Sequence, residues 1–498
     1  MAESSPHSGD AESAEPATAG LVAIVLAVTI VRIATLVADP IALSVDEAQY
    51  WIWAQSPSFG YYSKPPMIAW LIAVTTTACG DGEACVRLAA PLLHGATTAA
   101  LYAIAAALYG RTTAWWSAAA YLLLPGVSVS ARIISTDVPL LLCWALALWC
   151  FVRALFTARR AWWVGLGAAV GFGLLSKYAM ALFPACAALA ALLSPEVRRR
   201  ISGPGLAAAA AIAALIAAPN VVWNWVNGFP SITHAATNLS IAGAAIDPGR
   251  ALGFLASQFA VFGPIMCGVL LFGGFLAFRR PTAMDWRDTI LLAFSLPIIV
   301  AVTIEALMAR AHANWAAPAF IAGTVYATRW MMNCRPILMQ ASFAIHLAAA
   351  ATVAGAGPVL AAFEARLPAW LDPAVRERGW EQIGPWLADL HWRYPEAVFV
   401  FDNRQAMAAA IYYARPLLND AAMWNSWGDL DNHFEMTTDP MRYVGRDLVY
   451  VNRTGSLDWV EGTYQRAMPL APLTIMTHKN RSLELHAHLL TRFGGYRQ

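Results

Sequence analysis

Runs of about 20 apolar residues recur along most of this chain, and they constrain its fold more than any other feature. Such a run crosses the hydrocarbon core of a bilayer as a helix, which satisfies its own backbone polar groups there. We predict about eleven spans, near residues 20–38, 87–109, 113–127, 137–156, 161–176, 179–194, 205–222, 253–278, 289–308, 314–332 and 337–361. The expected fold is therefore a polytopic α-helical membrane protein.

Composition supports this class and excludes others. Charged residues make up 13% of the chain, whereas soluble domains carry about 25%. The 33 Lys and Arg nearly balance the 31 Asp and Glu, which argues against a nucleic-acid partner bound through a clustered basic excess. The seven cysteines form no CxxC pair, and no glycine-rich phosphate loop is present, so metal-ribbon and nucleotide sites lack their motifs.

The basic residues between the spans indicate the orientation. They fall in alternate connections, which the positive-inside rule places in the cytoplasm; the members are Arg111, Arg153, Arg159, Arg160, Arg198, Arg199, Arg200, Arg279, Arg280, Arg287, Arg329 and Arg335. An odd number of spans starting inside then puts the C-terminus outside. The predicted location is the cell inner membrane, with the active site facing the periplasm.

The remaining segments give the expected domains. Residues 1–19 are polar and are expected to form a disordered cytoplasmic tail, ahead of a transmembrane domain at 20–361 with a periplasmic loop at 39–86. Residues 362–498 are long enough for a domain of their own. A buried strand at 397–401, a helix at 404–414 and a strand at 447–452 predict a small α/β periplasmic domain there.

The periplasmic loop holds an acidic pair, Asp46 and Glu47, directly after the first span. One interpretation is a helix start, with Ser44 or Asp46 as N-cap. The other is a general base at the membrane edge, placed to deprotonate an acceptor from lipid or water. The stretch 46–55 is amphipathic, and 67–78 is apolar but too short to span, so both are expected along the membrane surface.

A third acid, Asp137, lies at the outer mouth of the fourth predicted span. Charges this close to hydrocarbon usually face a cavity or a partner. Arg132 is one expected partner, and an N-cap role ahead of Pro139 is a second structural explanation.

Basic residues on the outer side are few, which gives each of them weight; they are Lys64, Lys177, Arg310 and His312. They either snorkel to the headgroups or bind a phosphate that enters from the lipid. Four of them around an acid-bearing loop favour phosphate binding.

Six motifs occur in an order that resembles the bacterial members of glycosyltransferase family 39. They are DEAQYW at 46–51, YYSKPPMIAWLI at 61–72, STDVPLLL at 135–142, SKYAM at 176–180, PNVVWNW at 219–225 and HANWAAPAF at 312–320. The family includes dolichyl-phosphate-mannose protein mannosyltransferases and lipid A aminoarabinose transferases. The resemblance implies the membrane-embedded class C glycosyltransferase fold, and it identifies neither the sugar nor the acceptor.

The resemblance also implies a reaction, in which a sugar passes with inversion from a polyprenyl phosphate to a periplasmic lipid, glycan or protein. Lipid A modification is one such role. Asp46 would be the base with Glu47 beside it, and Asp137 matches the second acidic motif. The family's donor-phosphate and HxNW motifs match here at Tyr61, Tyr62, Lys64, His312 and Asn314.

The leaving group is a lipid phosphate, which needs charge stabilisation more than protonation. The candidates for that role are Lys64, Arg132, Lys177 and Arg310. Many relatives carry an acid immediately before the lysine, and Ser63 stands there instead, so no metal ligand is predicted. No cofactor is assigned. A divalent metal stays an open alternative, for which the sequence offers no ligand motif.

Two other functions stay open at this stage. One is an oligosaccharide ligase or polymerase that uses a lipid pyrophosphate, and the other is a lipid-linked sugar transporter or flippase. The expected partners are the bilayer, the polyprenyl-linked sugar and its acceptor, and the chain is expected to be a monomer. Cys79 and Cys85 flank a glycine-containing turn on the outer side, so they are predicted either to form a disulfide or to stay as half-buried thiols.

Overall fold

The computed structural model describes residues 14–39, 41–157, 159–238, 246–279, 284–363, 368–372, 374–418 and 420–496. The chain divides into two compact units. Unit 1 comprises residues 1–37, 87–225 and 236–354, and unit 2 comprises 38–86, 226–235 and 355–498. The loop 39–86 thus groups with the C-terminal domain rather than with the helices that precede and follow it in sequence.

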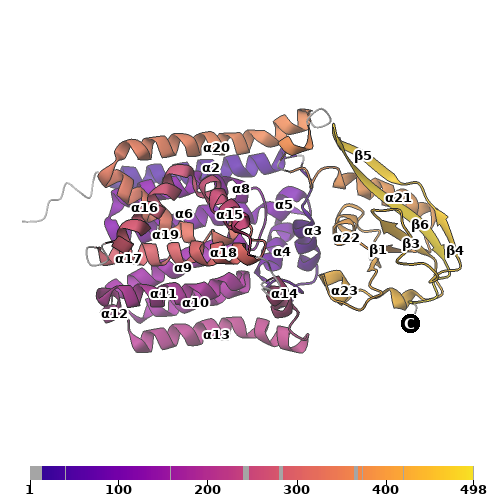
Figure 1. Cartoon of the computed structure of the whole chain (residues 1–498), viewed down its shortest axis with the longest axis horizontal. Coiled ribbons are helices and arrows are strands. Elements are labelled where there is room, and N and C mark those ends of the chain that lie inside the picture. Colours follow the sequence, from indigo (N-terminus) through magenta and orange to yellow (C-terminus); the bar gives the residue numbers. More distant parts are fainter. Residues whose placement is uncertain are drawn as a thin grey trace, which may run out of the picture. The chain divides into compact units, whose positions relative to one another are not determined.

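Unit 1 is a bundle of helices whose long members run side by side (Figure 1). Every predicted span coincides with helix: α2 Ala14–Val37, α6 Ala89–Tyr109, α7 Arg111–Leu123, α9 Asp137–Phe156, α10 Arg160–Ser176, α11 Leu182–Leu193, α13 Gly203–Val226, α15 Pro248–Phe262, α16 Pro264–Arg279, α17 Trp286–Ala293, α18 Leu296–Met308, α19 Ala319–Cys334 and α20 Pro336–Phe363. Shorter pieces are α8 Pro125–Ser130, η1 Tyr178–Ala181, α12 Pro195–Arg200 and η3 Ala313–Ala316. Of the predicted tail, residues 1–13 lie outside the described residues, and α2 already begins at Ala14.

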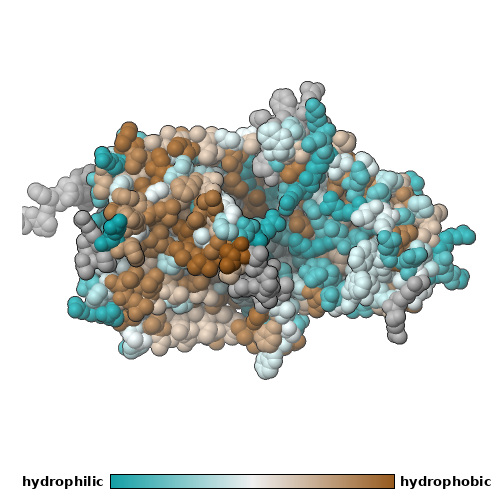
Figure 2. Space-filling model, in the orientation of Figure 1, coloured by the Kyte–Doolittle hydropathy of each residue, from teal (hydrophilic) through white to brown (hydrophobic). Residues whose placement is uncertain are grey.

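The outer surface of unit 1 is apolar, as lipid contact requires. Figure 2 shows hydrophobic residues over much of this surface. Leu215 and Phe278, two residues of this unit, are 75% and 87% exposed. Within the described residues, six helices are long and apolar enough to cross a bilayer, and seven if α15 and α16 count as one span. The chain is therefore a multi-pass membrane protein, and the count of eleven stays a prediction.

The predicted span near 253–278 is two helices bent by 118°. Gly263, at the bend, has φ of 87°, a conformation that residues with a Cβ disfavour.

Aromatic residues pack around α9. Trp144 of this helix is fully buried, and its ring centroid lies 5.2 Å from that of Phe183. A buried α9 fixes Asp137, at its first residue, relative to the bundle.

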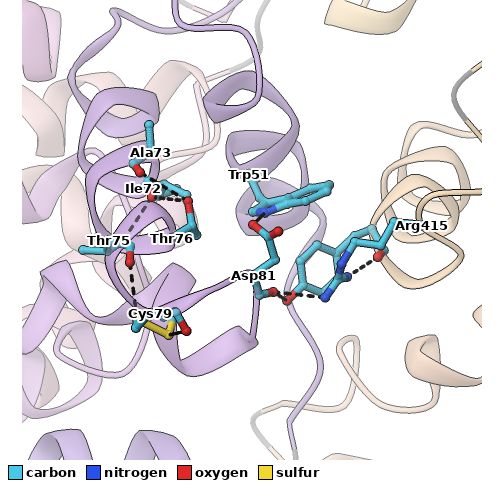
Figure 3. Close-up of a disulfide and its surroundings, with 10 residues drawn as sticks. Trp51, Ile72, Ala73, Thr75, Thr76, Cys79, Asp81 and Arg415 are labelled. Carbon is cyan, nitrogen blue, oxygen red and sulfur yellow. Dashed lines mark hydrogen bonds between the residues drawn. A yellow bond between two sulfur atoms is a disulfide. The ribbon is translucent and has the colours of Figure 1, made fainter.

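In unit 2 the predicted surface segments are helices, α3 (Val45–Ala54) and α4 (Met67–Cys79), followed by the short α5 (Glu83–Arg87). Cys79 and Cys85 form a disulfide, which confirms the predicted bridge (Figure 3). The turn that it closes carries Asp81, whose Oδ1 accepts a hydrogen bond of 2.8 Å from Trp51 Nε1. The bridge therefore ties α4 to the turn that supports α3.

The C-terminal part of unit 2 confirms the predicted strand–helix–strand unit, with β1 Val398–Phe401, α22 Arg404–Tyr413 and β3 Leu448–Asn452. The sheet has the order β2-β1-β3-β6-β4, and β1 pairs in parallel with both β2 (Ala422–Met423) and β3. The antiparallel strands β4 Arg466–Pro469, β5 Leu473–His478 and β6 Arg481–Thr491 were not predicted. The remaining helices are α14 Pro230–Asn238, α21 Ile383–Arg393, α23 His433–Thr437 and the one-turn η5 Ala369–Leu371, η6 Trp380–Gln382 and η7 Pro440–Tyr443.

Candidate active site

Asp46 lies in the first turn of α3, and its carboxylate is 54% exposed. Ser44 is the N-cap of this helix, and together with Glu47 it forms a capping box. Glu47 is 1% exposed, and its carboxylate accepts from the backbone N–H of Ser44 at 3.0 Å. The two adjacent acids thus have different surroundings. Glu47 caps the helix, which satisfies backbone donors, and Asp46 presents its carboxylate to solvent.

Arg404, in the first turn of α22, binds the Asp46 carboxylate. Its Nη2 donates to Asp46 Oδ1 at 2.9 Å, and its Nη1 donates to Gln49 Oε1 at 2.7 Å. Asp46 and Gln49 are three residues apart and therefore share one face of α3. One guanidinium fork thus fixes the orientation of the predicted base, which suits the planar geometry of arginine.

His234, in α14, stands among the charges of this region. Burial lowers the pKa of its imidazole, the positive charges of Lys64 and Arg404 lower it further, and Asp431 and Asp46 act in the opposite direction. The ring of Tyr62 packs edge-on against it, with the ring centroids 5.5 Å apart. Lys64 therefore lies within electrostatic reach of the same histidine as Asp46.

Tyr61 and Tyr62 are buried rather than open to a ligand, at 3% and 7% exposure. Tyr61 stacks on Trp53 with ring centroids 4.6 Å apart, and its hydroxyl donates to the carbonyl of Trp53 at 3.0 Å. The hydroxyl of Tyr62 donates to the carbonyl of Leu430, and burial is the main cause of its raised pKa. Both tyrosines shape the loop that presents Lys64, whose backbone exchanges hydrogen bonds with that of Tyr61.

A second polar group lies in unit 1, at the start of α9. Lys177 Nζ lies 2.7 Å from Asp137 Oδ1, and Asn314 Nδ2 donates to Asp137 Oδ2 at 2.6 Å. Three predicted residues from three motifs therefore meet at one carboxylate. The side chain of Asp137 is 7% exposed and that of Lys177 21%, so the pair is largely withdrawn from water.

Two structural explanations offered for Asp137 are wrong. Its partners are Lys177 and Asn314 and not Arg132, whose Nη1 donates to the carbonyl of Val353 in α20. The N-cap of α9 is Thr136, and Asp137 is the first helical residue. The Asp137 carboxylate is therefore held by Lys177, which follows α10, and by Asn314.

Two further predicted residues of unit 1, Arg310 and His312, lie just before η3. Arg310 and His312 are exposed, and the ring of His312 lies 5.6 Å from that of Trp315. The motif containing Lys177 also contributes Tyr178, whose hydroxyl donates to Asn220 Oδ1 at 2.9 Å and accepts from Asn224 Nδ2 at 3.2 Å. This contact explains the buried asparagines of the PNVVWNW motif.

Sequence reasoning missed Arg404, Gln49 and His234. A basic residue directly after a buried strand and at the start of a helix was the available signal for Arg404, because ligands gather at the carboxyl ends of parallel strands. Nothing in the sequence pairs it with Asp46. Within the described residues, no three His, Cys, Asp or Glu side chains are grouped as a metal site would require.

The chain is similar to proteins of known family and fold. Residues 63–223 match the model of the dolichyl-phosphate-mannose-protein mannosyltransferase family. The lipid A galacturonosyltransferase RgtD of Rhizobium johnstonii is 38% identical over 314 residues, which cover 62% of this chain and 64% of RgtD. The lipopolysaccharide core galacturonosyltransferase RgtA of the same organism is 29% identical over 270 residues, or 53% of this chain and 52% of RgtA. The chain thus spans less than two thirds of either relative.

The fold matches solved structures over nearly the whole chain. ArnT from Cupriavidus metallidurans in the apo state superposes with a TM-score of 0.65, at 16% identity, over 97% of this chain and 100% of ArnT. The same protein bound to undecaprenyl phosphate gives a TM-score of 0.63, at 18% identity, over 96% and 99% of the two chains. The predicted resemblance is therefore confirmed: this chain has the class C glycosyltransferase fold of ArnT and carries the signature of the dolichyl-phosphate-mannose-protein mannosyltransferases at residues 63–223.

Proposed function

We propose that this chain is a glycosyltransferase (EC 2.4 class) that moves a sugar, with inversion, from a polyprenyl-phosphate donor to a periplasmic acceptor. The observation that carries the proposal is the exposed Asp46 carboxylate, oriented by Arg404 within a region that also holds Lys64 and His234. The likeness to RgtD and to ArnT bound to undecaprenyl phosphate supports the choice of donor.

The proposed step is a single displacement. Asp46 takes the proton of an acceptor hydroxyl as its oxygen attacks the anomeric carbon, and the carbon–oxygen bond to the lipid phosphate breaks on the opposite face. The electron pair leaves with the polyprenyl phosphate. Lys64 stabilises the charge that develops on that phosphate, in the way fixed cations favour a leaving oxyanion.

The Asp137, Lys177 and Asn314 cluster is proposed to bind substrate within unit 1. A lysine held by a carboxylate keeps a fixed position, and the amide of Asn314 is held by the other oxygen of the same carboxylate. Groups fixed in this way lose little entropy when they engage a ligand. We propose that they contact the sugar or its phosphate.

The acceptor is proposed to be a lipid A-type glycolipid, and the sugar a uronic acid. The support is the name of RgtD, which is a lipid A galacturonosyltransferase and shares 38% of aligned residues with this chain. The protein is proposed to act in the cell inner membrane, with Asp46 facing the periplasm. A phosphatase reporter fused after Gln498 should be active, and one truncated near Arg199 should be silent; the reverse pattern contradicts this orientation.

The test is product formation in membranes that contain the chain, supplied with a labelled polyprenyl-phosphate sugar and a lipid A acceptor. Asp46→Asn should remain inserted and monodisperse, yet lose at least about a hundredfold in turnover. Asp458→Asn, a change at an exposed aspartate in the same unit, serves as the matched control. Near-normal turnover by Asp46→Asn contradicts its role as base, and sugar-lipid flux in proteoliposomes without product contradicts the transferase in favour of a flippase.

A further inference from the structure

The C-terminal domain contains a pocket of about 240 Å³ that the reaction above does not use. Its polar wall includes Arg376, Arg378, Gln405, Arg453, Arg481 and Ser482, which we call the arginine pocket. These residues come from the turn before η6, the start of α22, the end of β3 and the start of β6. Arginine side chains therefore line one pocket from three parts of the chain, and α22 adds the neutral Gln405.

Positive charge in the arginine pocket exceeds what the protein neutralises. Arg378 is paired with Asp372 at 2.8 Å, with both side chains 3% exposed, and His478 also contacts Asp372 at 3.1 Å. Arg376, Arg453 and Arg481 form no ion pair among the described residues, and no acid lines the pocket. Converging guanidinium groups repel one another unless an anion lies between them.

The sheet topology independently marks this place as a ligand site. From β1 the chain moves to β2 on one side, and then to β3 on the other side of β1. Ligands of open α/β sheets bind outside the carboxyl ends of the strands at such a switch point. Gln405 follows the carboxyl end of β1 and Arg453 follows that of β3, so both lie at this edge.

The pocket is also joined to the predicted base. Arg404, which binds Asp46, and Gln405, which lines the pocket, are consecutive residues in the first turn of α22. The side-chain amide of Gln405 further donates to the carbonyl of Arg376 at 3.3 Å. A group held in the pocket and the Asp46 carboxylate therefore act on the same turn of helix.

We propose that the arginine pocket binds the anionic head group of the acceptor, through a phosphate or carboxylate attached to a sugar. Guanidinium forks match the paired oxygens of both groups. The volume of about 240 Å³ equals the liquid volume of about eight water molecules, at about 30 Å³ each. That is room for a phosphate and neighbouring sugar atoms, and a polar wall does not suit an acyl chain. The identity of the ligand as an acceptor rests on the proposed function, whereas anion binding itself does not.

The test is a binding titration of the full-length protein in detergent, without turnover. Inorganic phosphate and glucosamine phosphate are titrated by calorimetry, and vesicles with phosphorylated or dephosphorylated lipid A are compared by co-sedimentation of protein in nanodiscs. Arg376→Gln/Arg481→Gln removes two exposed charges and leaves the buried Arg378–Asp372 pair intact. Arg442→Gln, at an exposed arginine outside the pocket, is the control.

The double variant should weaken binding at least about tenfold relative to the control, equal to about 1.4 kcal/mol. Preference for phosphorylated lipid A vesicles assigns the pocket to a lipid head group, and binding of inorganic phosphate alone assigns it to free phosphate. Absence of binding, or binding that the double variant leaves unchanged, overturns the proposal. Because no turnover is measured, retained binding in a chain without transferase activity would contradict only the proposed function.

Discussion

The guanidinium of Arg404 donates to Asp46 across 358 residues of sequence and joins the first turns of α22 and α3. Because its second nitrogen binds Gln49, the same side chain holds the Asp46 carboxylate in one orientation on α3. We regard Arg404 as a positioning residue for Asp46.

Arg404→Ala is expected to lower kcat about tenfold, the loss of about 1.4 kcal/mol of transition-state stabilisation, with little change in donor KM. Arg404→Lys should recover only part of kcat, because one ammonium does not reproduce the fork that reaches two acceptors. Steady-state kinetics on the two variants checks this. Equal kcat in wild type and Arg404→Ala would contradict the positioning role, and a rise in KM alone would indicate a binding role instead.

Lys64→Ala is expected to weaken donor binding about tenfold, since an ammonium group acts on a phosphate mainly as a point charge. Acceptor binding should change less. Lys479→Ala is a matched control, because Lys479 is an exposed lysine of the same unit. Competition with unlabelled polyprenyl phosphate measures the donor affinity. The assignment does not survive if the donor binds both variants equally.

Removing only the lysine of the Lys177–Asp137 pair should destabilise the fold more than removing both charges together. Lys177→Met leaves a 7% exposed carboxylate with Asn314 as its partner, and breaking a buried pair in this way costs about 3–5 kcal/mol, less here because Lys177 is partly exposed. The double variant Asp137→Asn/Lys177→Met removes both charges and should unfold at a higher temperature than Lys177→Met. Thermal unfolding in detergent measures both, and equal melting temperatures would contradict a charge-pair explanation.

The stability of unit 2 should fall between about pH 6.5 and 4 because of His433. Its ring packs edge-on against Trp53 and Tyr61, with centroids 5.3 and 5.8 Å away, and burial lowers its pKa from 6.5 to about 4. The unfolded chain therefore takes up this proton at a higher pH than the folded chain, so folding stability is lost as the pH falls. The loss reaches about 3 kcal/mol at most.

His433→Phe keeps the ring contacts and removes the titrating group, so its melting temperature should depend less on pH between 4 and 6.5. His391→Phe, outside this cluster, is the control. Thermal unfolding at several pH values distinguishes them, and identical pH profiles for the wild type and His433→Phe would show that the acid sensitivity arises elsewhere.

Much of the fold was predictable because it depends on local patterns. Apolar runs located the helices of unit 1, and alternating buried strand and helix located β1, α22 and β3. Two cysteines around a short turn made a disulfide one of two expected states, and the structure has the disulfide. The β5–β6 hairpin was missed, because the apolar residues of β5 are half-buried or exposed and its two buried positions are polar, so the strand lacks an apolar buried face.

The site was predictable only in part, because its contacts are distant in sequence. Motifs identified Asp46 and Asp137 as residues, but not their partners. Arg132, the basic residue nearest to Asp137 in sequence, was expected to pair with it. Lys177, 40 residues away in sequence, forms the pair instead. No local pattern encodes where an arginine of the C-terminal domain meets the first loop.

Unit 2 draws its parts from both ends of the chain, and this determines when it is completed during synthesis. Tyr412 donates to the carbonyl of Asp81 at 2.6 Å across 331 residues, and Arg404 reaches Asp46 across 358. The ribosome makes the loop with Asp46 early and its partners last. The first loop therefore lacks these two contacts until α22, at Arg404–Tyr413, has been translated. A chain that stops before α22 lacks Arg404 and Tyr412, which are the partners of Asp46 and Asp81 in the first loop.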